Sequence, residues 1–140
     1  MEKLELKHLA GYLPYGLKAK DINTKEVRIV TLFHFTYDMN TVGYNHLLHE
    51  GLLLSKHLPI LRPLSDLTKE IELNGEKFVP INELKSQCSY AVGCELDKFI
   101  VYKNYGDMHY WIIKKLYEWH FDIHGLIEKG LAIEINTLNQ

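Results

Sequence analysis

The chain has 140 residues, of which 46% are hydrophobic and 24% charged, and its net charge is −2. This is the composition of one folded domain, and it excludes an intrinsically disordered chain. The longest apolar runs fall far short of the roughly 20 residues that a membrane-spanning helix needs, so we expect no membrane segment. Residues 1–7 alternate charge with leucine and lack the pattern of a secretory signal, which predicts a cytoplasmic protein.

The first 64 residues are predicted to be mainly β. A short amphipathic helix opens the chain, since leucines recur at helical spacing up to Leu13 and Pro14 stops the pattern. A strand at 17–20 and a polar turn at 21–25 lead into the clearest strand, 26–37. That strand is rich in β-branched and aromatic residues and is apolar on both faces, which is typical of a strand that is central in its sheet or covered on both faces.

The stretch 59–64 reads as a strand but carries Pro59 and Pro63, which favours an edge position or a short pairing because proline cannot donate to a sheet ladder. A short helix, a hairpin, a long strand and a late edge strand are the order found in a small SH3-like barrel. We therefore predict an α+β fold: a small N-terminal antiparallel sheet of this kind, then a β-hairpin, with a C-terminal helical segment packed on it. One compact domain, 1–140, is expected, with a subdomain seam near 63–66 that separates a mainly β part, 1–64, from an α+β part, 65–140.

The strongest local signal is Asn74-Gly75, which stands between two alternating stretches in 71–79 and predicts a type I′ hairpin turn. Ser65 is expected to cap a turn just before this hairpin. Three further helices are expected, at 82–85, 108–120 and 123–129, capped by Asn82, Asp107 and Asp122 in that order. Gly130 is expected to end the last of them. Two further strands are expected at 90–105 and 132–135.

Histidine and cysteine are the residues to weigh for metal binding or catalysis. His120 and His124 stand four apart, so a continuous helix would place both imidazoles on one face, as in zinc sites. The glutamate of the H-E-x-x-H pattern is missing, however, and Asp122 is expected to interrupt the helix. Cys88 and Cys94 match no common zinc spacing and have no fixed base beside them. His120 and His124 thus remain weak metal candidates, and no catalytic residue and no cofactor is predicted.

The other histidines and the glycines add no catalytic signal. No cluster of cysteines or carboxylates accompanies His46, His49 and His57. We therefore expect these histidines to face solvent or to act as capping residues. The nine glycines occur singly, which excludes a glycine-rich phosphate loop. Only two arginines are present, Arg28 and Arg62, and there is no basic run. Strong binding to duplex DNA is therefore not expected.

Aromatic residues are dense near the last long helix. Most of them are expected to form its core-facing side, but Tyr110, Trp111 and Tyr117 lie off the predicted Ile112–Leu116–Trp119 stripe. Since tyrosine and tryptophan are enriched in protein interfaces and also stack on single-stranded bases, these three are candidate binding residues. Two further candidates, Tyr37 and Asn40, lie where the long strand meets the following loop.

Three stretches of the chain resemble a known family: 8–18, which reads HLAGYLPYGLK; 59–81, with the segments PILRPLSDLTKEI and NGEKFVPI; and 119–133, which reads WHFDIHGLIEKGLAI. They are similar to small uncharacterised proteins of phages and prophages of Bacteroides-type gut bacteria. The resemblance covers about half of the chain. It implies an accessory protein of a mobile element in a bacterial host cell, and it carries no catalytic or binding residue with it.

From these observations we expect a non-enzymatic accessory protein that binds another protein, with a second copy of itself among the candidate partners. Two alternatives stay open. One is a nucleic-acid-binding accessory protein that uses the aromatic residues beside Lys114 and Lys115. The other is a small metal-dependent or Cys–His hydrolase that uses His120, His124 or Cys88.

Overall fold

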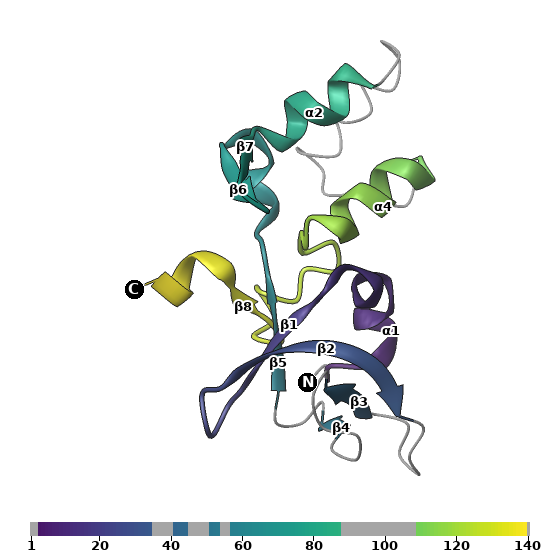
Figure 1. Cartoon of the computed structure of the whole chain (residues 1–140), viewed down its shortest axis with the longest axis vertical. Coiled ribbons are helices and arrows are strands. Elements are labelled where there is room, and N and C mark those ends of the chain that lie inside the picture. Colours follow the sequence, from purple (N-terminus) through teal and green to yellow (C-terminus); the bar gives the residue numbers. More distant parts are fainter. Residues whose placement is uncertain (1–2, 35–40, 45–50, 54–56, 88–108, 140) are drawn as a thin grey trace.

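The protein has an α+β fold built from an open sheet, a separate hairpin and short helices (Figure 1). The computed structural model describes residues 3–34, 41–44, 51–53, 57–87 and 109–139. The elements are α1 (Leu6–Leu9), η1 (Ala10–Tyr15), β1 (Lys18–Asp21), β2 (Val27–His34), β3 (Thr41–Tyr44), β4 (Gly51–Leu53), β5 (His57–Leu61), η2 (Leu64–Thr68), β6 (Ile71–Leu73), β7 (Glu76–Phe78), α2 (Pro80–Ser86), α4 (Tyr110–Glu118), β8 (Ile133–Glu134) and η3 (Ile135–Asn139), where η marks a 3₁₀ helix.

Six strands form the main sheet in the order β4-β3-β2-β1-β5-β8. All neighbours in it are antiparallel except β5 and β8, which are parallel. Ala19 of β1 lies opposite Arg28 of β2 on one side and Pro59 of β5 on the other. Within the described residues the strand order starts at β4 and ends at β8 without closing. The SH3-like barrel is therefore not confirmed.

The 59–64 strand does not lie at an edge, but its pairing with β8 spans only Ile60 and Leu61, which is the short pairing that the sequence left open. β5 lies inside the sheet, between β1 and β8. Pro59 lies opposite Ala19 of β1, but β8 pairs only with Ile60 and Leu61. Pro59 is tolerated because it has a paired strand on one side only within the described residues. The missing N–H of the proline thus lies outside the part of β5 that is paired on both sides.

The long strand predicted at 26–37 is β2, which runs from Val27 to His34; residues 35–37 lie outside the described part of the chain. It is central in the sheet, between β1 and β3. This central position is one of the two arrangements that its apolar faces predicted, whereas the beginning of the strand is exposed on one face. Val27 and Ile29 are 45% and 37% exposed, whereas Val30, on the opposite face, is buried.

The predicted hairpin is confirmed. β6 and β7 pair with Ile71 opposite Phe78, and the turn residues Asn74 and Gly75 have φ angles of 53° and 83°. Both angles are positive, which is the requirement of a type I′ turn and the reason for this dipeptide.

The predicted caps around this hairpin are wrong. Helix α2 begins at Pro80, a residue suited to the first helical position because it needs no N–H partner there, and Asn82 lies inside the helix. Ser65 also lies inside its element, since η2 follows Pro63. The last long helix is α4, and its predicted cap Asp107 lies outside the described residues.

The helix predicted at 123–129 does not form; this segment is a series of turns. The carboxylate of Asp122 accepts hydrogen bonds from the N–H groups of Leu126 and Ile127, at 2.8 and 2.9 Å. An N-cap side chain reaches the second or third residue after it, so these bonds to the fourth and fifth residues close a loop instead. Gly125 and Gly130 have φ angles of 68° and 73°, which help the chain to turn.

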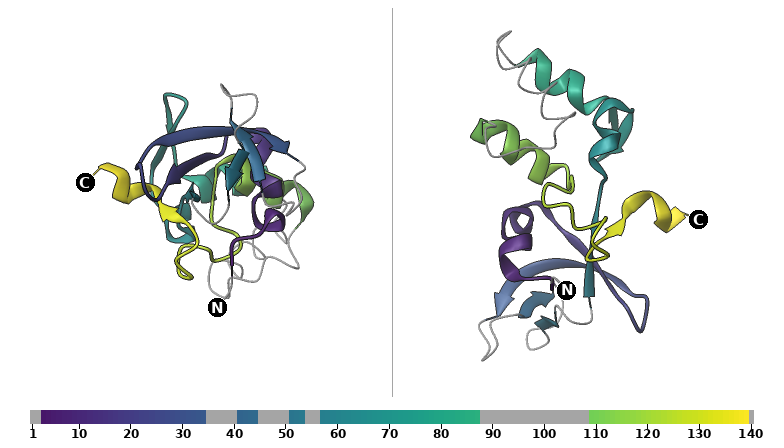
Figure 2. Two further views of the ribbon diagram at one scale, coloured as in Figure 1. Left: turned by 90° about the horizontal axis from the view of Figure 1, so that it is seen from below. Right: turned by 180° about the vertical axis from the view of Figure 1, so that it is seen from behind.

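The buried side chains form two clusters, one at each end of the molecule (Figures 1 and 2). The first cluster lies between α1, η1 and the sheet: Leu4, Leu9, Tyr12, Leu17, Ala19, Val30, Leu61, Leu126 and Ala132. The second cluster lies between η2, the hairpin, α2 and α4: Leu67, Ile71, Ile81, Leu84, Ile112, Leu116, Trp119, Phe121 and Ile123. The chain segment that follows β5 joins the two ends in the views of Figures 1 and 2.

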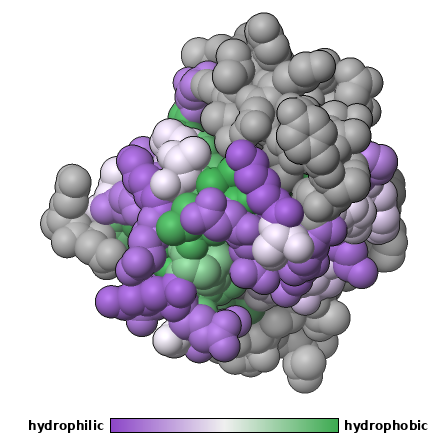
Figure 3. Space-filling model, turned by 90° about the horizontal axis from the view of Figure 1, so that it is seen from above, coloured by the Kyte–Doolittle hydropathy of each residue, from purple (hydrophilic) through white to green (hydrophobic). Residues whose placement is uncertain are grey.

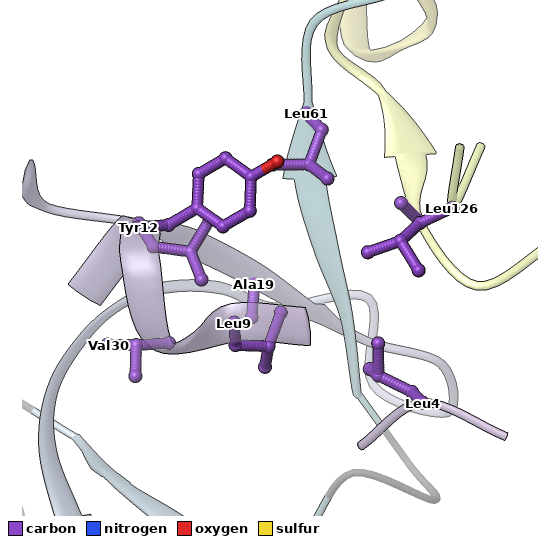
Figure 4. Close-up of a cluster of buried hydrophobic side chains, with 9 residues drawn as sticks. Leu4, Leu9, Tyr12, Ala19, Val30, Leu61 and Leu126 are labelled. Atoms are coloured by element: carbon purple, nitrogen blue, oxygen red, sulfur yellow. The ribbon is translucent and has the colours of Figure 1, made fainter. Parts of the chain in front are cut away.

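Tyr12 and Tyr117 connect the clusters. Tyr12 is fully buried in the first cluster, and its hydroxyl donates to the carbonyl of Phe121, in the second cluster, at 2.6 Å. The ring of Tyr117 packs against both clusters and meets Tyr12 edge-on, with 4.8 Å between ring centroids. Figure 4 shows Leu61 of β5 between Tyr12 on one side and Leu126 on the other. The subdomain seam near 63–66 stays a prediction.

Candidate ligand-binding cleft

The structure does not bring the three aromatic candidates together as one exposed patch. Tyr110, at the first position of α4, is 79% exposed. Trp111 is partly buried against the second cluster, and Tyr117 is packed between the clusters, with its hydroxyl 3.2 Å from Nε2 of His124. The candidates Tyr37 and Asn40 lie outside the described residues.

The two metal candidates, His120 and His124, do not share a helix face. Helix α4 ends at Glu118, and His120 has a φ of 61°, which turns the chain away from the helix. Nε2 of His120 donates to the carbonyl of Tyr15 at 2.7 Å, whereas His124 faces Tyr117 and packs near His8, 5.9 Å between ring centroids. Among the described residues no group of three or more histidine, cysteine, aspartate or glutamate side chains could hold a metal ion.

Burial favours the neutral form of both histidines. Burial lowers the pKa of His120 below 6.5, opposed by its bond to the Tyr15 carbonyl. Burial also lowers the pKa of His124, and the nearby His8 adds to this effect.

His57 is buried rather than at the surface, which corrects the sequence-based expectation. It stands on β5, 6% exposed, and its Nε2 lies 3.4 Å from Oδ2 of Asp21 on β1. The strand pairing places His57 directly opposite Asp21, so the contact follows from the sheet register. His46, His49, Cys88 and Cys94 lie outside the described residues.

A polar cleft of about 370 Å³ is present, which we call the Arg62 cleft. It lies where the end of β5, η2, the start of β6 and η3 meet. Its lining residues are Arg62, Asp66, Lys69, Glu70, Ile71, Glu72, Ile135 and Asn136. Five of these side chains carry a charge, so the cleft is suited to a polar or ionic ligand.

The backbone fixes Arg62 at the wall of this cleft. Its N–H donates to the carbonyl of His120 at 2.7 Å, and its carbonyl accepts from the N–H of Asp122 at 2.8 Å. These two bonds form a parallel bridge between Arg62 and Phe121. The arginine therefore continues β5 for one residue, and its side chain is held at the junction of the two clusters, only 8% exposed.

The surroundings of Arg62 compensate its buried positive charge only partly. Its Nε is completely buried and has no hydrogen-bond partner among the described residues. Burial lowers the pKa of Arg62, and the negative charge of Asp66 only partly offsets that effect. A buried charge is costly unless it is paired and hydrogen-bonded.

Asp66, the buried acid of the cleft, already has other partners. It is 4% exposed, and its Oδ2 accepts from Nδ2 of Asn136 at 2.9 Å. Its Oδ1 lies 3.4 Å from Nζ of Lys69, the residue after η2. Each carboxylate oxygen of Asp66 thus has one of these two groups, Asn136 or Lys69, beside it.

Sequence reasoning missed both Arg62 and Asp66 as site residues. The one signal present was the position of Arg62, a charged residue between Leu61 and Pro63 in an otherwise apolar run. That Asn136 lies 70 positions from its partner Asp66 could not be inferred without the fold.

A second, more apolar cleft of about 480 Å³ also borders η2. It is lined by Pro63, Leu64, Ser65, Thr68, Asp122, Gly125, Ile127 and Glu128. Figure 3 views the molecule from the end that carries α2 and α4, where apolar surface gathers in the middle and is flanked by hydrophilic side chains.

Comparison with known proteins adds no assignment to these sites. No protein-family model matches the chain, no curated protein matches it, and no solved structure matches it. Across the part of the chain that the structure describes, every helix is too short or too polar to cross a membrane.

Proposed function

We propose that this protein is a non-enzymatic accessory protein of a phage or prophage, and that it acts by binding another protein through the N-terminal end of α4. The single observation that carries the proposal is Tyr110, which is 79% exposed at the first turn of the helix. Exposed tyrosines are enriched in protein interfaces because they bury a large area at a small entropic cost.

The surface at this end of the molecule also supports the proposal. Seen from the end that carries α2 and α4, the described surface has an apolar middle flanked by hydrophilic side chains (Figure 3), which is the arrangement of a protein interface with its polar rim. Lys115 pairs with Glu118 at 3.1 Å and lies over the ring of Trp119, so its charge is partly compensated within the helix. This pairing favours a protein partner over a nucleic acid, which would need uncompensated cations.

The test compares proteins captured from a lysate of a Bacteroides-type bacterium by the tagged wild type, Tyr110→Ala, Tyr110→Phe and Lys114→Ala, quantified by mass spectrometry. Loss of an aromatic hot spot weakens binding by about tenfold or more. We expect Tyr110→Ala to lose a partner that Tyr110→Phe retains. Lys114→Ala is the matched control, since Lys114 lies one turn from Tyr110 on the same helix side and is exposed.

Self-association is measured in the same variants by sedimentation equilibrium. A dimer that Tyr110→Ala dissociates would identify a second copy of the chain as the partner. If the captured proteins and the molar mass are the same for wild type and Tyr110→Ala, the proposed binding surface is wrong. Equal unfolding midpoints of the variants show that the helix itself is unchanged.

A further inference from the structure

The Arg62 cleft has the features of a site that is completed by a ligand. Arg62 is 8% exposed and lines the cleft, yet its Nε has no partner among the described residues. Asp66, a buried acid of the same cleft, bonds to Asn136 and lies close to Lys69. Within the described part of the chain, the guanidinium therefore has a nearby negative charge but an unused N–H donor at Nε.

A carboxylate is the group that fits this arginine. The planar guanidinium presents parallel N–H donors that match the two oxygens of a carboxylate. Arg62 is the buried positive charge of the cleft, whereas Lys69, with a side chain 67% exposed, stands at its solvent edge.

The rim of the cleft favours a positive group. Glu70 and Glu72 line the cleft at the start of β6, and both are exposed. They stand two positions apart, on the same side of the extended chain, opposite the buried Ile71. The charge of the cleft is thus positive at the buried arginine and negative at its exposed edge.

We propose that the Arg62 cleft binds a small zwitterion, with the ligand carboxylate against Arg62 and its ammonium group near Glu70 and Glu72. Amino acids and the ends of short peptides have this chemistry. The volume of about 370 Å³ lies in the range of small-molecule pockets. This site is distinct from the surface at Tyr110 and does not depend on it.

Nuclear magnetic resonance can follow this binding directly, because the chain contains only two arginines. In protein labelled with ¹⁵N-arginine, Nε of Arg62 reports on the cleft. Arg28, whose Nη2 pairs with Glu26 at 2.7 Å, is the internal control. The protein is titrated with 6-aminohexanoate, 4-aminobutyrate and glycine, and with hexanoate, methylammonium and inorganic phosphate.

We expect the Arg62 signal to shift with at least one of the amino acids while the Arg28 signal stays constant. Hexanoate lacks the ammonium group. It should bind about fivefold more weakly than whichever of the three amino acids binds best. Methylammonium should leave the Arg62 signal unchanged. The peptide Lys-Gly-Gly with a free and with an amidated C-terminus then separates free amino acids from peptide ends as ligands.

Variants assign the two halves of the site. Arg62→Lys keeps the charge but loses the paired donors, and should weaken binding by about tenfold or more. Arg28→Lys is its matched control. The double variant Glu70→Gln/Glu72→Gln should lose the preference for 6-aminohexanoate over hexanoate. Its affinity for hexanoate should be unchanged or higher.

An Arg62 signal that responds to none of these compounds overturns the proposal, and that result needs only the wild-type protein. Equal affinities for hexanoate and the amino acids, or tighter binding of phosphate, overturn the assignment of a zwitterion.

Discussion

One polar atom in the core, the hydroxyl oxygen of Tyr12, connects the two ends of this molecule. The hydroxyl of Tyr12 donates to the carbonyl of Phe121 at 2.6 Å and accepts from the N–H of Ile123 at 3.2 Å. All three residues are buried. One side-chain oxygen thus satisfies two backbone groups that are more than 100 positions away in the sequence.

Tyr12→Phe is expected to destabilise the protein by about 1 kcal/mol, because it removes the hydroxyl that bonds to both buried groups and leaves only the 2.9 Å bond between the N–H of Ile123 and the carbonyl of Phe121. Urea denaturation followed by circular dichroism measures this change. Tyr110→Phe is the control, since its ring is 79% exposed and its unfolding midpoint should equal that of the wild type. An equal midpoint for Tyr12→Phe would show that water replaces the hydroxyl.

At the scale of elements, the contact of η1 with α4 depends on a glycine. A Cβ built on Gly11 would lie only 2.4 Å from Cζ of Tyr117. Tyr117 cannot move freely, since its ring also packs against Tyr12 and its hydroxyl meets His124. The two elements approach so closely only because residue 11 has no side chain.

Gly11→Ala should therefore destabilise the fold by about 1–3 kcal/mol through overpacking, measured by urea denaturation. Combining Gly11→Ala with Tyr117→Leu tests the cause, because a smaller side chain at 117 leaves room for the new Cβ. The double variant should be less destabilised than the sum of the two single variants. Additive effects would exclude the clash. Gly16→Ala is a useful comparison: nothing lies near its Cβ, so its cost comes only from a φ of 69°.

The local turns show where sequence reasoning works at this scale. The type I′ turn at Asn74-Gly75 is confirmed because both residues determine it by their own backbone preferences. Asp122 was assigned to a helix cap on the same kind of local argument, and that assignment was wrong. Its carboxylate bonds to Leu126 and Ile127 in a buried loop, and Phe121 just before it pairs with Arg62. Tertiary contacts overrode the local preference there.

For the whole molecule, stability should depend on the protonation of His120 and His124. Burial lowers the pKa of both groups in the folded state, whereas the unfolded chain keeps ordinary values near 6.5. Below pH 6.5 the unfolded state therefore binds more protons than the folded one. The contribution of these histidines is fully present above pH 6.5 and is lost as the pH falls through their folded pKa values.

We expect the free energy of unfolding, measured with urea at pH 7.5, 6.5 and 5.5, to fall as the pH is lowered. His124→Gln removes one titrating group and keeps an acceptor for the hydroxyl of Tyr117, so its pH dependence should be weaker than that of the wild type. If the wild type and His124→Gln lose stability in parallel between pH 6.5 and 5.5, His124 does not carry this effect.

The sequence by itself determined the features that depend on neighbouring residues. The order of the expected elements predicted an α+β fold, and alternation with Asn74-Gly75 predicted the hairpin. The leucine spacing predicted the first helix, although Pro14 does not end it but lies inside the 3₁₀ helix that follows. Apolar periodicity also identified Ile112, Leu116 and Trp119 as the buried side of α4. These inferences succeeded because backbone preference and the burial of apolar side chains act over a few residues.

Only the tertiary structure decided which distant residues meet. It separated His120 from His124, buried His57 beside Asp21, and left Tyr110 as the exposed member of the three aromatic candidates on α4. It also assembled the Arg62 cleft from a strand end, two 3₁₀ helices and the start of the hairpin. No local pattern encodes such a site, because the burial and the charge of Arg62 depend on segments that approach each other only after folding.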